Sequence, residues 1–300
     1  MNSERKRILL VGDNPFHGIS HLSQERGRAR SAETSSTSYA ASLVVSSLAN
    51  GADGFMFSVD ETTLSILRQI REMGESRHLR LYAMVPYAFE YVRLATQIGS
   101  SGLAKIFAKQ LAVSGNIKAI AMGLKAAVRA DPAALLKTYL IYEISRIKSS
   151  AGKSANIESV LLHEIATDMA LGFNLDWFFR CYIRFLLDLA ITPGFNTRNF
   201  SYLVRKFEEW NIDFQKIIVV APFNKVGFQM NPNKTECEKS LANLPVANTI
   251  ALSILAAGYL EPSEAVSYLK TLPNLKGVVV GVSKEEHAYE TFKILKENLV

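Results

Sequence analysis

The chain has 300 residues, of which 48% are hydrophobic and 21% are charged. This composition is typical of a folded globular protein and excludes a disordered or low-complexity chain. The net charge of +6 comes from dispersed basic residues, which do not interleave with aromatic residues along one stripe, so we expect no nucleic-acid partner.

Eight apolar, strand-like runs alternate with helix-like runs along the chain. The predicted strands are residues 7–12, 54–59, 79–85, 159–163, 189–192, 216–221, 249–256 and 277–281. The main predicted helices are residues 39–50, 61–73, 175–187, 201–210, 234–244 and 284–299, with a further helix beginning at Pro262. Alternating strands and helices indicate βαβ units and a parallel sheet. Eight units predict one α/β domain over residues 1–300, a (β/α)8 TIM barrel whose active site lies at the C-terminal strand ends.

Residues 88–153 are too long for a single crossover helix, which needs about 12 to 15 residues. The segment contains several helical patterns, broken by Gly99, Gly115 and Pro132. We therefore predict a helical insertion between the third and fourth strands. It could act as a lid, as a surface for forming a homo-oligomer, or as additional packing of the outer ring.

Two features bear on the cellular setting. The cysteines, Cys181 and Cys237, have no metal-binding or redox spacing, which favours a reducing compartment. The first residues contain no apolar leader, and no run reaches the roughly 18 apolar residues of a transmembrane helix. We expect a cytoplasmic protein that does not associate with a membrane.

The loop after the first strand carries the strongest candidate residues. Asp13 follows the strand directly and is a candidate catalytic residue, with Asn14 beside it as a candidate ligand-binding residue. Asp13-Asn14-Pro15 is equally able to form a simple turn. His17 and His21 are spaced i, i+4, so one helical turn would place both on one side as ligands of a divalent metal. Solvated or hydrogen-bonded histidines are the alternative.

Two further candidates end the second and fourth strands. Asp60 and His163 would face the barrel mouth beside Asp13 and His17, giving two carboxylates and two imidazoles for acid–base chemistry or a mixed metal site. Asp60 has an alternative role as the N-cap of the next helix. Glu164 follows His163 and is expected to point to the opposite face if the strand continues.

A third group of residues suits an anionic ligand. The group comprises Asn196, Arg198, Asn224 and Lys225 after the fifth and sixth strands, with Ser283 and Lys284 at the start of the last helix. The N–H groups at a helix N-terminus favour an anion, and such barrels often hold a phosphate near the last two strands. Ser283 has an alternative role as an N-cap, with Glu286 completing a capping box.

Several short stretches resemble the aldo/keto reductase-like barrel family. The stretches are Gly-Phe-Asn-Thr-Arg-Asn (194–199), Ala-Pro-Phe-Asn-Lys (221–225), Leu-Ala-Ala-Gly-Tyr-Leu-Glu-Pro-Ser-Glu-Ala (255–265) and Val-Val-Val-Gly-Val-Ser-Lys-Glu-Glu (278–286), with an echo in Leu-Leu-His (161–163). Their order and spacing match the family over roughly residues 190 to 300. The resemblance implies an aldo/keto reductase-like (β/α)8 barrel and an NADPH-binding turn at Ser283 and Lys284.

The catalytic pattern departs from that family. Its reductases use a Tyr, a Lys, an Asp and a His, and the last two correspond to Asp60 and His163. The expected Tyr is missing after Asp60, and the third strand ends in Met-Val-Pro-Tyr rather than Lys. Hydride transfer needs a proton donor for the new alkoxide, and Tyr87 is the candidate acid that this sequence offers.

Three hypotheses follow from the sequence. The first is an enzyme that acts on a small anionic carbonyl-type metabolite by acid–base or metal-assisted chemistry, through Asp13, His17, Asp60 and His163. The second is an NADPH-dependent reductase with Tyr87 as an atypical acid. The third is a non-catalytic binding protein that uses the 88–153 helices as its partner surface.

Overall fold

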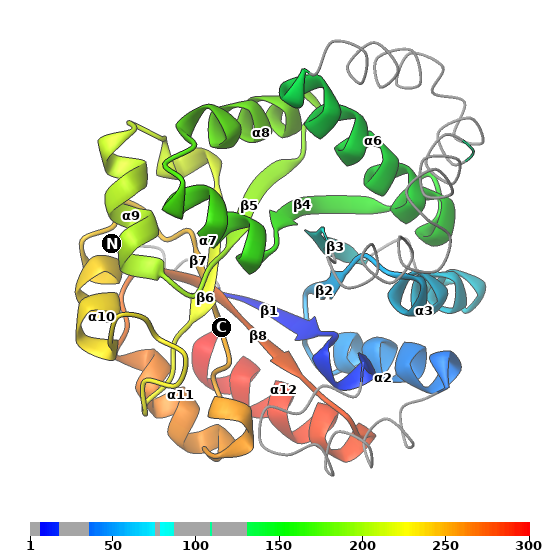
Figure 1. Cartoon of the computed structure of the whole chain (residues 1–300). Coiled ribbons are helices and arrows are strands. Elements are labelled where there is room, and N and C mark those ends of the chain that lie inside the picture. Colours follow the sequence, from blue (N-terminus) through cyan, green and yellow to red (C-terminus); the bar gives the residue numbers. More distant parts are fainter. Residues whose placement is uncertain (1–6, 18–35, 76–78, 87–108, 110–130) are drawn as a thin grey trace, which may run out of the picture.

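A computed structural model of the chain describes residues 7–17, 36–75, 79–86, 109 and 131–300. Within them, eight parallel strands form a closed barrel in which each strand pairs with its neighbours in sequence and β1 pairs with β8 (Figure 1). The strands are β1 (Ile8–Gly12), β2 (Gly54–Ser58), β3 (Arg80–Val85), β4 (Asn156–Leu162), β5 (Thr192–Asn196), β6 (Ile218–Pro222), β7 (Thr249–Leu252) and β8 (Leu275–Gly281). The predicted TIM barrel is confirmed.

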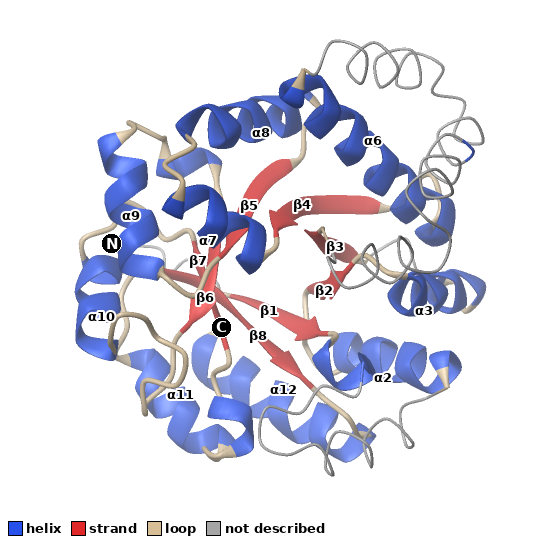
Figure 2. Ribbon diagram, in the orientation of Figure 1, coloured by secondary structure: helices blue, strands red, loops and turns tan. Residues whose placement is uncertain are grey.

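Helices surround the barrel as an outer ring (Figure 2). They are α2 (Thr37–Ala49), α3 (Glu61–Glu72), α6 (Pro132–Ala151), α7 (Glu164–Gly172), α8 (Asp176–Asp188), α9 (Phe200–Glu209), α10 (Lys234–Ala242), α11 (Pro262–Lys270) and α12 (Glu285–Leu299). Short 3-10 turns are η1 (Asn14–His17), η3 (Phe214–Lys216) and η4 (Ala256–Gly258). None of the helices in the described ranges is long and apolar enough to cross a membrane.

The core has two parts that follow from the alternation of side chains along each strand. Inward-facing residues such as Leu10, Tyr82 and Ile250 fill the barrel. Outward-facing residues such as Leu9 and Phe57 pack against the helices in a larger cluster. The interior is therefore solid, and a ligand has access only at the barrel ends.

Some elements differ from the prediction. The seventh strand was predicted to run to Ala256, but β7 ends at Leu252, and the next residue, Ser253, has a positive φ of 53°. The fifth strand was predicted to end at Thr192, before Pro193, but β5 begins at Thr192 and pairs Pro193 with Val160. The predicted start at Leu189 instead falls in a turn in which Ala190 has a positive φ of 57°. Helix α7 was not predicted at all. Residues 164–172 are too few for a clear helical period, and the helix is fixed by its packing near β5 and α9.

The 88–153 insertion lies mostly outside the described residues. Within the described part, α6 begins with Asp131 as N-cap and Pro132 in the first turn, so Pro132 starts this helix and is not only the break that the sequence suggested. Arg146 of α6 binds Glu143 on the same helix and Glu61 of α3, with N–O distances of 3.2 Å to each. This ion-pair cluster joins α6 to the helix that begins at the barrel mouth.

The close approach of β8 to β1 leads to a stability prediction. A Cβ atom on Gly277 would lie 2.3 Å from the carbonyl oxygen of Ile8, which belongs to a paired strand and has little freedom to move. We expect Gly277→Ala to lower the free energy of unfolding by about 1–3 kcal/mol, measured by urea denaturation. The control is Gly172→Ala, because a Cβ at Gly172 meets nothing within 4 Å. Equal stability of the two variants would contradict the prediction.

Candidate active site

The C-terminal ends of β1, β2, β4 and β5 carry three predicted catalytic residues and one predicted ligand-binding residue. Asp13 directly follows β1, Asp60 lies two residues after β2, and His163 directly follows β4. Asn196 is the last residue of β5. All four residues lie at the same end of a parallel barrel, as the sequence predicts.

His17 lies between the two aspartates. Its Nε2 is 3.1 Å from Oδ2 of Asp13, and its Nδ1 is 3.4 Å from Oδ2 of Asp60. The turn η1 that carries His17 is anchored by Phe16, which is buried and packs near the ring of Phe55. Asp13 is held in turn by the backbone N–H of Ser58, which donates to Oδ2 at 2.6 Å. We call Asp13, His17 and Asp60 the carboxylate–histidine clamp.

Asp60 has both of the roles that the sequence left open. Its Oδ1 accepts a hydrogen bond from the backbone N–H of Thr63 at 2.8 Å, and the hydroxyl of Thr63 completes a capping box at the start of α3. Its Oδ2 is the oxygen that faces His17. The helix cap therefore fixes the position of the carboxylate that contacts the imidazole.

The clamp favours the protonated form of His17. Burial lowers the pKa of His17, but the hydrogen bond with Asp13 and the negative charges of Asp13 and Asp60 outweigh burial, so the pKa is raised. An imidazole with a carboxylate at each ring nitrogen offers no lone pair to a metal unless one contact breaks. In the described part of the chain, no group of three or more His, Cys, Asp or Glu side chains is arranged to hold a metal ion. His21, the predicted second ligand, lies outside the described residues.

The raised pKa of His17 leads to a pH prediction. A pKa that is higher in the folded state gives stability that is complete below the unfolded pKa, about 6.5, and is lost as pH rises through the folded value. We expect His17→Gln to lower the free energy of unfolding by about 1.5–3 kcal/mol at pH 6 and by less at pH 9. Thermal unfolding at the two pH values measures this, with exposed His287→Gln as the control. A difference that grows with pH would contradict the clamp.

His163 has the opposite protonation preference. Its Nδ1 accepts a hydrogen bond from the backbone N–H of Ile165 at 3.2 Å, which makes His163 the N-cap of α7. Burial lowers the pKa of His163, and the positive charge of Arg198 acts in the same direction against the charges of Glu164 and Asp13. The ring is therefore neutral near pH 7 with its proton on Nε2. A neutral imidazole in this tautomer is a hydrogen-bond donor for a carbonyl oxygen.

Glu164 does not point to the outer face, and this expectation was wrong. The strand ends at Leu162, so Glu164 begins α7 instead of continuing the alternation. Its Oε1 binds the Arg198 guanidinium at 2.9 Å, and its Oε2 accepts a hydrogen bond from Nδ2 of Asn196 at 3.1 Å. Oδ1 of Asn196 is buried and has no hydrogen-bond partner among the described residues. Arg198 is thus partly neutralised, while Asn196 retains an unused acceptor.

Asp168 is a residue of this region that sequence reasoning missed. Its carboxylate accepts hydrogen bonds from the Thr197 hydroxyl, the Arg198 backbone N–H and the Asn199 side chain, and so fixes the turn after β5. Burial raises the pKa of Asp168 against the effect of these hydrogen bonds. Glu164 and Asp168 are spaced i, i+4, a signal that becomes visible only once α7 is recognised.

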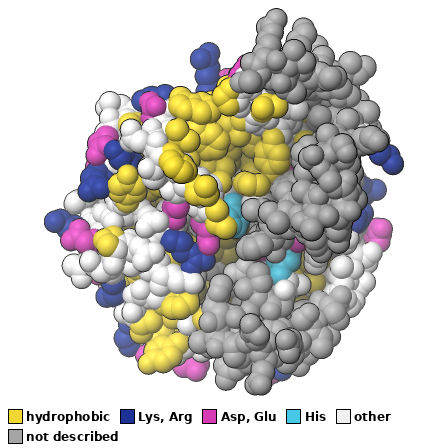
Figure 3. Space-filling view, viewed as in Figure 1, with side chains coloured by type: hydrophobic (Ala, Val, Ile, Leu, Met, Phe, Trp, Pro, Cys, Tyr) yellow, Lys and Arg dark blue, Asp and Glu magenta, His cyan; other side chains and the backbone are white. Residues whose placement is uncertain are grey.

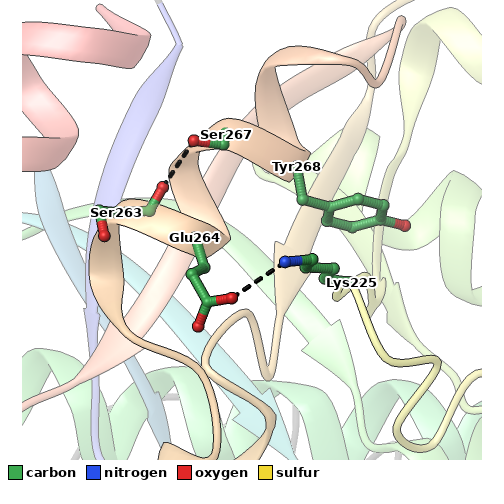
Figure 4. A pocket seen from close by; sticks show the side chains of 5 residues that line it. All are labelled: Lys225, Ser263, Glu264, Ser267 and Tyr268. Atoms are coloured by element: carbon green, nitrogen blue, oxygen red, sulfur yellow. Dashed lines mark hydrogen bonds and ion pairs between the residues drawn. The ribbon is translucent and has the colours of Figure 1, made fainter.

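Asn224 and Lys225 do not join Arg198 in an anion site, in contrast to the prediction. The buried Asn224 amide closes its own loop by exchanging hydrogen bonds with the backbone of Phe228, at 2.9 and 2.7 Å. Lys225 is exposed and binds Glu264 of α11 at 2.9 Å (Figure 4). The surface pocket beside this pair is about 390 Å³, and its other described lining residues are Ser263, Ser267 and Tyr268. Arg198 and Lys225 are therefore each paired with a separate carboxylate, that of Glu164 and that of Glu264.

The last helix begins one residue later than predicted. Lys284 is the N-cap of α12 and makes no side-chain cap hydrogen bond, so the expected capping box of Ser283 and Glu286 does not form. Ser283 is buried, and Lys284 is exposed. The two residues remain candidates for an anionic group. Asn14 is exposed at the start of η1, and Tyr87 lies outside the described residues.

A groove of about 360 Å³ opens beside His163. Its described lining comes from His163, from Pro86 after β3, and from apolar residues of α7 and α8. Hydrophobic side chains gather over these two helices on the face of the molecule drawn in Figure 3. We call this feature the α7 groove.

Comparison with known proteins gives a fold but no sequence family. No family model matches the chain, and no curated protein matches its sequence. Two solved structures described as the "putative aldo-keto reductase from Pseudomona aeruginosa" align over 97% of this chain and 91% or 90% of theirs. Their TM-scores are 0.59 and 0.58, each at 12% sequence identity. The fold is aldo-keto reductase-like.

Within this aldo-keto reductase-like barrel, the side chain that faces Asp60 does not come from the third strand. The resemblance leads us to expect a Lys at the end of the third strand, but β3 ends in Met84 and Val85. The side chain that faces Asp60 is instead His17, supplied by the turn after β1. The side chain beside this carboxylate therefore comes from a different strand end of the same barrel.

Proposed function

We propose that the chain is an enzyme that removes a proton from the carbon next to a carbonyl group. The observation that carries the proposal is the contrast between the contacts of two histidines at one barrel mouth. His163 accepts a hydrogen bond at Nδ1 and its pKa is lowered by burial, whereas His17 lies between the carboxylates of Asp13 and Asp60, which raise its pKa against the effect of burial. Paired titratable groups whose surroundings push their pKa values apart are typical of acid–base sites.

Asp13 is the proposed base. Both oxygens of Asp60 are engaged, one in the α3 cap and one with His17. Oδ2 of Asp13 receives the Ser58 N–H and His17, but no hydrogen bond from a described residue reaches its Oδ1. Asp13 follows β1 and His163 follows β4 at the same end of the barrel, and the charge of Asp13 acts to raise the pKa of His163. Oδ1 of Asp13 and the N–H of His163 suit the two ends of an enolising group.

The proposed step balances without a further reactant. Oδ1 of Asp13 takes the proton, the C–H electron pair forms a carbon–carbon double bond, and the carbonyl π electrons move to oxygen. Nε2–H of His163 donates a hydrogen bond to that oxygen, where negative charge develops. Return of the proton to the same carbon gives exchange. In a hydroxyketone, the proton of the hydroxyl on that carbon can move to the former carbonyl oxygen, and protonation of the former carbonyl carbon then gives isomerisation. His17 is a positioning residue that orients Asp13.

The anionic part of the earlier hypothesis has less support than the carbonyl part. Arg198 is bound to Glu164, and the exposed Lys225 is bound to Glu264. Among the predicted anion-binding residues, only Ser283 and Lys284 at the uncapped start of α12 retain that role.

Hydrogen exchange tests the proposed function directly. Aldehydes, ketones and hydroxyketones are incubated with the protein in D2O, and NMR records deuterium uptake at the carbon next to the carbonyl. We expect exchange for a subset of these compounds, faster than in buffer without protein. The exchange should be retained in the Glu264→Gln protein, because Glu264 is exposed and paired with Lys225. The absence of exchange with every class of carbonyl compound would refute the proposal.

An NADPH-dependent reductase is the second candidate, and two observations favour it. The first turn of α12 has no side-chain cap, and the buried Oδ1 of Asn196 lacks a partner among the described residues. Ser283, Lys284 and the first N–H groups of α12 would hold the phosphates of NADPH, which would supply a hydride. Fluorescence titration with NADPH separates the candidates, because saturable binding that weakens in Lys284→Glu favours the reductase. The acid–base proposal requires no such binding.

A further inference from the structure

The α7 groove has one polar side chain among its described lining residues, that of His163. His163 is the proposed donor of a hydrogen bond to the carbonyl oxygen of the substrate. His163 lies in the lining, with its donor nitrogen fixed by the hydrogen bond that Nδ1 accepts from Ile165. The other described lining residues are all apolar, with no cation and no carboxylate among them. A ligand whose carbonyl oxygen reaches His163 therefore has an apolar surface immediately beside it.

The apolar side chains of the groove are exposed to an unusual degree. Ile165, Met169 and Phe173 are 43%, 57% and 69% exposed, although each is a large hydrophobic residue. Their i, i+4, i+8 spacing places all three on one side of α7 and its C-terminal end. Phe178 of α8 also lines the groove. An apolar concavity with one convergent polar group is typical of a small-molecule site, and about 360 Å³ falls in the usual range.

We propose that the α7 groove binds the apolar part of the substrate, so that the substrate class is a neutral carbonyl compound with an alkyl or aryl group next to the reacting carbon. This inference rests on the proposed function for the role of His163, and it replaces the small anionic metabolite of the sequence-based hypothesis. Covering exposed apolar side chains supplies the binding free energy, and the hydrogen bond from His163 orients the carbonyl.

A series of methyl ketones, with the second alkyl group extended from ethyl to octyl, tests the proposal. Isothermal titration calorimetry measures affinity, and NMR in D2O measures exchange next to the carbonyl. We expect affinity to rise by up to about fourfold for each methylene group until the groove is filled. Met169→Glu places a charge at a 57% exposed position and should abolish this rise. The control is Leu187→Glu, at a 39% exposed position on α8 outside the groove lining, which should retain it.

The two readouts separate failure of the inference from failure of the proposed function. Affinity that does not depend on chain length, or an equal loss in Met169→Glu and Leu187→Glu, would overturn the inference even if exchange is observed. Affinity that depends on chain length and is lost only in Met169→Glu would support the groove as a binding site. Such binding without exchange would refute the acid–base function alone.

Discussion

Asp13→Asn is expected to reduce the exchange rate by about 10² to 10⁴-fold, the usual contribution of a positioned general base. The amide has the size of the carboxylate, and its oxygen still accepts the hydrogen bond from Ser58 N–H at Oδ2. It has no basic oxygen to take a proton, so the loss should fall on kcat rather than on KM. NMR exchange rates at saturating ketone measure the effect.

The matched control for Asp13→Asn is Glu264→Gln, which also removes one negative charge but lies at the exposed pair with Lys225. We expect the control to keep its exchange rate within about twofold. Thermal unfolding of both variants separates loss of chemistry from loss of fold. An Asp13→Asn protein that is folded and retains more than a tenth of the activity would exclude Asp13 as the base.

His163→Asn is expected to reduce the exchange rate by about 10² to 10³-fold, as when a single donor to a developing oxyanion is removed. Asn is a good N-cap, so its side-chain oxygen can replace Nδ1 in the hydrogen bond from Ile165 N–H and keep α7 in place. The shorter side chain carries no donor at the position of Nε2. Loss of that donor should lower kcat with a smaller effect on substrate affinity.

A second substitution keeps the role of His163 testable. His163→Ala removes both the donor and the helix cap, so it should lose activity to a similar degree and also lose about 1 kcal/mol of stability. The pH profile gives an independent readout, because a neutral donor predicts activity that declines when acid protonates His163 below its lowered pKa. Asn and Ala variants with full activity would show that His163 serves only as a cap.

The strands were the most predictable part of the fold because each is an apolar run with clear breaks. Residues 216–221 were recognised by their β-branched character, and β6 is observed at Ile218–Pro222. The fifth strand was predicted at residues 189–192, but β5 begins at Thr192 and contains Pro193. A barrel strand tolerates proline where the missing N–H donor is not needed by its neighbour, and sequence alone does not reveal that register.

The sequence predicted which residues lie at the candidate site, but it did not predict the contacts between them. Position at the strand ends is enough to assign Asp13, Asp60 and His163 to the barrel mouth, because all parallel strands end on one side. Which ring nitrogen faces which carboxylate depends on η1, whose turn places His17 between β1 and α3. Arg198 and Lys225 follow the ends of two neighbouring strands, β5 and β6. They nevertheless pair with carboxylates on different helices, α7 and α11.

The sequence by itself determined the eightfold alternation, and with it the closed barrel and the end at which polar side chains collect. The physical reason is that period and apolar character are local properties of the chain. Only the tertiary structure decided the protonation of His17 and His163, because a pKa depends on burial and on charges brought from distant segments. The tertiary structure also decided where an apolar ligand has room, since the α7 groove joins residues of α7 and α8 with Pro86, which is distant in sequence.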